Sequence, residues 1–201
     1  ALLGVCTGPW TPYAFDFETG AGEHELTIVV DNRFTAEHPT LMHAYADFYP
    51  FGGIYRNVVL RALPAKRIER VAVTTLDPAT GRVRLAIRTA GFRDGRAAFA
   101  IAFDGRAPKT RELAVRGGVA TVALKVPGFK VWTPESPALH VVEVAAGGDA
   151  VVERFGIRTI ATRGQEILLN GAPIKLRGVN RHESHPELGP VANPQIAFDD
   201  L

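Results

Sequence analysis

Five polar side chains that could do chemistry gather near the end of the chain: Arg181, His182, Glu183, His185 and Glu187. Residues 174–179 before them alternate around Lys175 and Arg177, which predicts a short strand. Asn193 and Pro194 after them favour the start of a helix, with Asn as N-cap and Pro at the first helical position. A strand, a loop and a helix in this order form half of a βαβ unit, and in barrels of such units the loops after the strands build the active site. The polar cluster therefore lies where a functional site is expected.

The two histidines of this cluster do not have the spacing of a metalloprotease zinc site. That site needs two histidines four residues apart on one helical face, whereas His182 and His185 are three apart and Pro186 follows. We therefore expect no metal ligand here and no cofactor in this chain. From spacing alone, His182 is equally well interpreted as a surface histidine that bonds to backbone.

A second candidate is Asp47, a carboxylate among aromatic residues. Aromatic rings cover the C–H faces of a sugar and a carboxylate accepts hydrogen bonds from its hydroxyls, so this mixture is typical of a saccharide site. The other interpretation of Asp47 is a loop aspartate that caps a turn before Pro50. Arg56 is expected to tie carbonyls and carboxylates together at a domain junction. The aromatic neighbours of Asp47 are Tyr45, Phe48, Tyr49, Phe51 and Tyr55.

The elements that must position these residues are mostly strands. Short β-prone runs at the start of the chain indicate antiparallel β-structure; they cover residues 2–5, 13–17, 25–30 and 54–60. The spacing then becomes regular, and seven strands are expected at 67–76, 83–90, 97–103, 111–115, 119–126, 139–145 and 151–157. Turn signals such as Asp94-Gly95 and Gly117-Gly118 separate them, as in an immunoglobulin-like sandwich of roughly 100 residues. We expect Trp132 to pack in the core of this sandwich, which shows no catalytic constellation.

The length, hydrophobic content and charge of the chain limit the classes of protein to which it can belong. With 201 residues, 46% of them hydrophobic, the chain can bury one or two cores. Its 23 Lys and Arg are scattered among 21 Asp and Glu, so no basic footprint for nucleic acid is present. The first residues predict neither a signal peptide nor a membrane span, and we expect no membrane partner. The single Cys6 is compatible with a reducing compartment; the localisation stays unknown, with the cytoplasm favoured.

Four stretches, in order along the chain, resemble one enzyme family. GVNRHESHPELG (178–189), preceded by ILLNGAPIKLR (167–177), is similar to the opening of the catalytic barrel in glycoside hydrolase family 2, the β-galactosidases and β-glucuronidases. DFYPFGGIYRNVVL (47–60), VWTPESPALHVVEV (131–144) and FGIR (155–158) agree with the same family. The resemblance implies three domains: the C-terminal part of a jelly-roll sugar-binding domain at 1–62, an immunoglobulin-like β-sandwich at 63–158, and the first βα unit of a truncated (β/α)8 TIM barrel at 159–201.

The resemblance also implies an activity. The parent protein would be a retaining β-glycosidase of carbohydrate catabolism that hydrolyses terminal β-linked sugars, most like a β-galactosidase. Its two catalytic carboxylates would lie on later barrel strands beyond Leu201, so no residue of this chain is assigned to catalysis and the chain alone would be inactive. Asp47 and His182 match substrate-binding positions of the family. A metal ion and a homo-oligomeric assembly in the parent enzyme are compatible with the family.

A second hypothesis is a non-catalytic β-sandwich module that binds carbohydrate or spaces domains. The sequence stops with its first helix barely begun, so we expect the chain to be an internal piece of a longer protein. Galactose, glucuronate and mannose would be told apart by loops outside this sequence, so the sugar itself is not readable from it.

Overall fold

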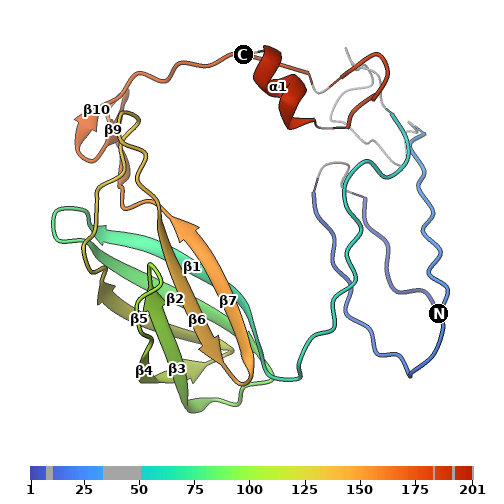
Figure 1. Ribbon diagram of the computed structural model, residues 1–201, viewed down its shortest axis with the longest axis horizontal. Coiled ribbons are helices and arrows are strands. Elements are labelled where there is room, and N and C mark those ends of the chain that lie inside the picture. The colour runs from blue at the N-terminus through green and yellow to red at the C-terminus, as the bar shows by residue number, and fades with distance from the viewer. Residues whose placement is uncertain (8–10, 34–50, 183, 192, 201) are drawn as a thin grey trace. The chain divides into compact units, whose positions relative to one another are not determined.

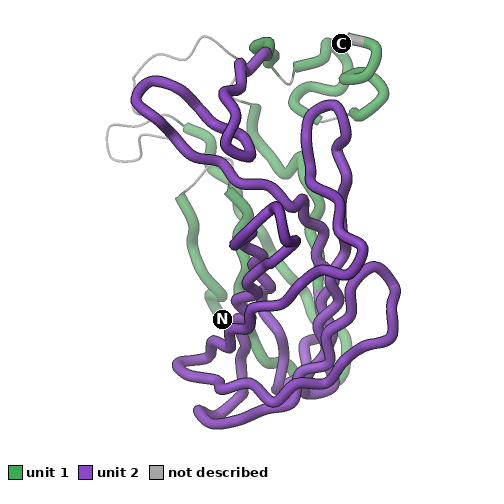
Figure 2. Tube along the Cα trace, turned by 90° about the vertical axis from the view of Figure 1, so that its left-hand side faces the viewer, with its two compact units in different colours: residues 1–60, 178–201 green, residues 61–177 purple. Residues whose placement is uncertain are grey.

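A computed structural model describes the protein over residues 1–7, 11–33, 51–182, 184–191 and 193–200. The chain divides into two compact units, a larger one of residues 61–177 and a smaller one of residues 1–60 and 178–201 (Figure 2). Strands make up nearly all of the regular structure, which confirms the mostly-β prediction (Figure 1). No helix within these ranges is long and apolar enough to cross a membrane.

The larger unit contains seven long strands, each at a place where the sequence predicts one. They are β1 (Arg67–Asp77), β2 (Arg82–Ala90), β3 (Gly95–Phe103), β4 (Lys109–Arg116), β5 (Val119–Lys125), β6 (His140–Ala146) and β7 (Asp149–Phe155). Alternation along a strand places successive side chains on opposite faces. In β2, Val83, Leu85 and Ile87 are fully buried, whereas Arg84 between the first two and Arg88 after Ile87 are exposed. The pattern that predicted the strands is thus also the pattern of burial.

The seven strands form one antiparallel sheet in the order β1-β2-β5-β4-β3-β6-β7. Only the pairs Val115↔Ala120 and Arg116↔Val119 join β4 to β5, so the sheet divides there into two layers. One layer holds β1, β2 and β5, and the other holds β4, β3, β6 and β7. The carboxylate Oδ2 of Asp149 accepts a hydrogen bond from the N–H of Ile68 at 2.8 Å, which ties the last strand to the first. The result is a nearly closed sandwich of the immunoglobulin-like kind.

The space between the layers is filled by aliphatic and aromatic side chains. Phe92 stacks on Phe99 with ring centroids 5.9 Å apart, and Phe103 meets Phe155 edge-on at 6.2 Å. The largest fully buried side chains are Phe99, Leu85, Ile87, Ile157 and the valines at 83, 115, 126, 142 and 144. Full burial of such a side chain contributes about 1.5–3 kcal/mol, so this core is the main source of stability in the larger unit.

A small sheet follows the sandwich within the larger unit. It consists of β8 (Ile160–Arg163), β9 (Glu166–Leu169) and β10 (Ala172–Pro173), antiparallel and in the order β10-β9-β8. Leu169 pairs with Ala172, so Asn170 and Gly171 are the two residues of a tight turn. Their φ angles of +51° and +83° lie in the left-handed region, which the Asn-Gly dipeptide favours.

The strand predicted at 174–179 is not formed. The structure describes these residues and assigns no ladder to them, although the N–H of Ile174 still bonds to the carbonyl of Ile167 at 2.9 Å. A parallel barrel strand is held by neighbours on both sides, and none of the described segments pairs with this one. The first βα unit of a barrel therefore remains a prediction.

The predicted helix start is confirmed. α1 (Pro194–Asp200) begins directly after Asn193, whose Oδ1 accepts a hydrogen bond from the N–H of Gln195 at 2.9 Å. This hydrogen bond makes Asn193 the N-cap of the helix. Proline is favourable at the first helical position, because an N–H there would have no partner within the helix.

The first part of the smaller unit has no strand in its described ranges, 1–7, 11–33 and 51–60. Side chains that alternation would bury are open to solvent here: Leu2, Val29 and Leu60 are 83%, 85% and 79% exposed. β-propensity reflects packing against neighbouring strands, so β-prone runs without partners need not form a ladder. The strands predicted for the jelly-roll segment are therefore not formed in these ranges.

Candidate functional site

The loop with the polar cluster is closed by backbone hydrogen bonds. His185 and Gly189 bond to each other in both directions, each N···O distance being 2.9 Å, and Gly189 has a φ of +59° that favours glycine. The N–H of Glu187 donates to Nδ1 of His185 at 3.2 Å. His185 is therefore engaged by its own turn and has a structural role.

His182 precedes this turn and has an exposed side chain. Its carbonyl oxygen accepts a hydrogen bond from the N–H of Ser184 at 2.9 Å. Glu183 between them lies outside the described residues. In the part of the chain that the structure describes, no group of three or more His, Cys, Asp or Glu could hold a metal ion. The two histidines thus differ in exposure: His182 is exposed, whereas His185 is half-buried.

Asp47, the other predicted substrate-binding residue, lies outside the described residues, as do Tyr45, Phe48 and Tyr49. Phe51, four positions after Asp47, is described. Its ring atom Cε1 lies 3.5 Å from the position that a Cβ on Gly189 would occupy, so the ring lies beside this glycine. Phe51 therefore lies next to the loop that follows His182, within the smaller unit.

Arg56 lies near an aromatic ring in the same segment. Its guanidinium carbon is 5.5 Å from the ring centroid of Tyr55, a cation–π arrangement. That Arg56 also ties carbonyls and carboxylates together remains a prediction.

Trp132 is not in the sandwich core, which corrects the sequence-based expectation. It is half-buried, and its ring faces Arg158, whose guanidinium carbon is 4.4 Å from the ring centroid. The side chain lies over Gly156, where an added Cβ would stand 3.0 Å from Trp132. An indole is large and carries an N–H that needs a partner, so tryptophan is rarely buried completely.

The sequence analysis missed a polar pair of the sandwich, a buried histidine bonded to a more exposed aspartate. His140 is 6% exposed, and its Nδ1 lies 2.9 Å from Oδ2 of Asp104. The N–H of Lys130 donates to Nε2 of His140 at 3.0 Å, and Oδ1 of Asp104 accepts from the N–H of Val141 at 2.8 Å. Since all four polar side-chain atoms have partners inside the sandwich, the pair is structural. The available signal was Asp104-Gly105, whose aspartate has a φ of +52°.

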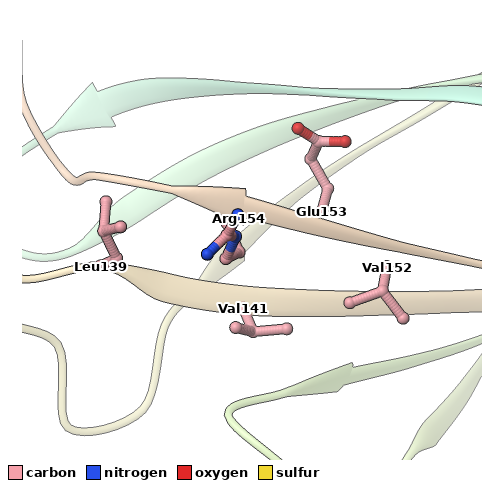
Figure 3. A pocket seen from close by; sticks show the side chains of 5 residues that line it. All are labelled: Leu139, Val141, Val152, Glu153 and Arg154. Atoms are coloured by element: carbon pink, nitrogen blue, oxygen red, sulfur yellow. The ribbon is translucent and has the colours of Figure 1, made fainter. Parts of the chain in front are cut away.

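An open groove of about 630 Å³ lies beside β6 and β7 (Figure 3). It offers one carboxylate and no aromatic ring, whereas hydrolysis of a glycoside needs two carboxylates. We assign no site to it. Its lining residues are Leu139, Val141, Val152, Glu153 and Arg154.

Comparison with known proteins identifies relatives of one kind. No protein-family profile matches the chain. Among curated proteins, it is 30% identical over 230 residues to a β-galactosidase of Photobacterium profundum and 29% identical over 231 residues to a β-galactosidase of Enterobacter cloacae. Each match covers 98% of this chain and 22% of the relative, so the chain spans about a fifth of the length of these relatives.

Solved structures agree with these matches. A family 2 β-galacturonidase from Eisenbergiella tayi, bound to galacturonate, matches with a TM-score of 0.68 and 25% identity over 85% of this chain and 32% of that one. A β-glucuronidase of Faecalibacterium prausnitzii matches with a TM-score of 0.61 and 29% identity over 77% of this chain and 25% of that one. All of these proteins are glycoside hydrolases. These matches support the resemblance to glycoside hydrolase family 2 that the motifs of the chain carry.

Proposed function

We propose that this chain is part of a retaining β-glycosidase that hydrolyses terminal β-linked sugars, with β-galactosides as the first substrate class. The observation that carries the proposal is the position of Phe51 beside Gly189, because it brings together the two segments whose motifs resemble substrate-binding parts of the family. The relatives named β-galactosidase support galactose. The structural neighbours named for galacturonide and glucuronide make uronic acids the competing sugars.

In this proposal Asp47 and His182 hold the sugar. A carboxylate can accept hydrogen bonds from two hydroxyls, and an imidazole can donate one or stack on the ring. The exposed position of His182 supports such a contact. Neither residue breaks the glycosidic bond, and each acts by holding the substrate near the geometry of attack.

We place the acid/base and the nucleophile outside these 201 residues. A retaining enzyme holds these two carboxylates roughly 5 to 5.5 Å apart, and positioning together with this pair supplies most of the acceleration. The sandwich supports this placement, because the side-chain atoms of its Asp104–His140 pair are all engaged in structural hydrogen bonds. The 201-residue chain by itself is then inactive.

The proposal is tested by assaying the full-length protein on aryl β-galactoside, β-glucuronide, β-galacturonide and β-mannoside. We expect turnover to be fastest with the galactoside and absent with the 201-residue chain. Faster turnover of a uronide would change the substrate class and keep the glycosidase. Sugar binding without any turnover would favour the other hypothesis, a non-catalytic carbohydrate-binding or spacer module.

A further inference from the structure

The side chain of Asn170 links the small sheet to the loop that carries Trp132. Oδ1 of Asn170 accepts a hydrogen bond from the N–H of Thr159 at 3.0 Å, and Nδ2 donates to the carbonyl of Trp132 at 3.0 Å. The backbone N–H of Asn170 donates to the carbonyl of Thr159 at 2.9 Å. One half-buried residue therefore joins the residue before β8, the turn after β9 and the loop that precedes β6.

The amide side chain of Asn170 satisfies both partners at once. The N–H of Thr159 needs an acceptor and the carbonyl of Trp132 needs a donor, so aspartate would lack the donor and glycine would lack both. The turn itself, with φ of +51° at this position, is compatible with Asn or Gly. The tie to Trp132 is therefore what distinguishes Asn170 from a residue that merely makes the turn.

Trp132 is itself held firmly on the sandwich. The backbone N–H of Trp132 donates to the carbonyl of Ile157 at 2.9 Å, and the side chain of Ile157 is fully buried. Arg158 covers the indole ring, and the backbone N–H of Arg158 donates to Oγ1 of Thr75 on β1 at 3.2 Å. The point to which Asn170 bonds thus moves with the sandwich.

The loop that carries Trp132 is also bonded to the sandwich at Lys130, two residues before Trp132. The N–H of Lys130 donates to Nε2 of the buried His140, and Nδ1 of His140 meets Asp104. The segment from Lys130 to Trp132 is therefore bonded to the sandwich on one side and to Asn170 on the other.

We propose that Asn170 is a positioning residue that fixes the β8–β9 hairpin on the sandwich. β10 follows Asn170 after one glycine, and its Ala172 and Pro173 are paired with β9, so the small sheet is fixed as a whole up to Pro173. The proposal stands on the hydrogen bonds alone and does not depend on the proposed function.

Hydrogen exchange of the 201-residue chain tests the fixing of the hairpin. In Asn170→Gly the turn keeps its φ and both side-chain bonds are lost, so the amides of Ile160–Leu169 should exchange about tenfold faster or more, while those of β2 and β6 stay as in the wild type. Asn170→Asp keeps the acceptor for Thr159 and loses the donor for Trp132, so exchange should rise in the same segment.

The matched control is Glu166→Gln in the same hairpin. It breaks the exposed Arg163–Glu166 pair, whose N···O distance is 2.8 Å, and should leave exchange near the wild-type rate because exposed pairs contribute little. Wild-type exchange of the hairpin in Asn170→Gly would overturn the proposal. An increase of equal size in β2 and β6 would also overturn it, since the effect would then be a general loss of stability.

Discussion

The ring of Phe51 lies beside Gly189, with Cε1 3.5 Å from the position that a Cβ on Gly189 would occupy. The two residues are far apart in sequence, and each lies in a stretch that resembles family 2 enzymes. Gly189 also closes the turn with His185 through two hydrogen bonds. The segment after Asp47 and the loop after His182 are thus held together at a point where the second segment is already rigid.

Replacing Phe51 with alanine should loosen the loop of residues 178–189. The ring is one of the contacts that hold this loop, so its loss raises the population of locally open states. We expect trypsin to cleave after Arg181 several-fold faster, as followed by mass spectrometry. Phe198→Ala, which removes a ring that is 78% exposed on α1, is the control and should leave the rate unchanged. Equal rates in the wild type and Phe51→Ala would contradict the contact.

Asp47→Ala and His182→Ala in the full-length enzyme should each lower kcat/KM by about ten- to a hundredfold. Loss of a charge-assisted hydrogen bond costs about 1.5–3 kcal/mol, which corresponds to this range. Thermal unfolding should be little changed, because the side chain of His182 is exposed. His24→Ala, an exposed histidine that bonds to Thr19 and Gly20, is the control and should keep the wild-type value. Wild-type kcat/KM in both variants would contradict a substrate-binding role of Asp47 and His182 and would favour structural roles for both.

The larger unit should lose stability in acid partly through Asp104. Burial acts to raise the pKa of Asp104, but hydrogen bonds from the N–H of Val141 and from His140, together with positive charge nearby, outweigh it and lower the pKa. A carboxyl whose folded pKa is depressed stabilises the fold above its unfolded pKa of about 3.9, and this contribution is lost as pH falls through the folded pKa.

Urea unfolding of the wild type and Asp104→Asn at several pH values checks this. The stability difference between them should be constant above about pH 5 and should shrink as pH falls below about 4. Asparagine tolerates the left-handed φ of +52° and keeps an acceptor for Val141, so the variant should fold. Two stability curves that stay parallel down to pH 2 would exclude Asp104 as a source of acid sensitivity.

Leu85→Ala should destabilise the sandwich by about 2–5 kcal/mol, because Leu85 is fully buried between the layers. Leu139→Ala removes the same atoms from a side chain that is 57% exposed, and should change stability by no more than about 0.5 kcal/mol. Denaturant unfolding of the two variants measures both values. Similar losses would mean that the core does not lie where the burial pattern places it.

The seven sandwich strands could be predicted because each carries its own evidence. In β2 every second residue is apolar, and Gly81 and Gly91 at its ends have φ angles of +67° and +74° that mark turns. The helix start was readable for the same reason, since Asn193 caps it through a bond to a residue two positions away. Local patterns of this kind do not need knowledge of a distant partner.

Features that depend on a partner far away in the sequence were either not predicted or predicted wrongly. Residues 174–179 alternate as a strand does, yet a ladder needs neighbours that alternation does not name. His140 and Asp104 are 36 positions apart, and Asn170 and Trp132 are 38 apart, so no spacing rule joins them. Trp132 was placed in the core from its residue type, whereas its contact with Arg158 keeps it at the surface.

The stereochemistry of hydrolysis tests the central claim most directly. Full-length protein is mixed with an aryl β-galactoside, and the anomeric proton of the released galactose is followed by NMR before mutarotation. A retaining enzyme works by two displacements, so the account predicts that β-galactose appears first and that α-galactose grows in later. Release of α-galactose first, or no release of galactose at all, would contradict it.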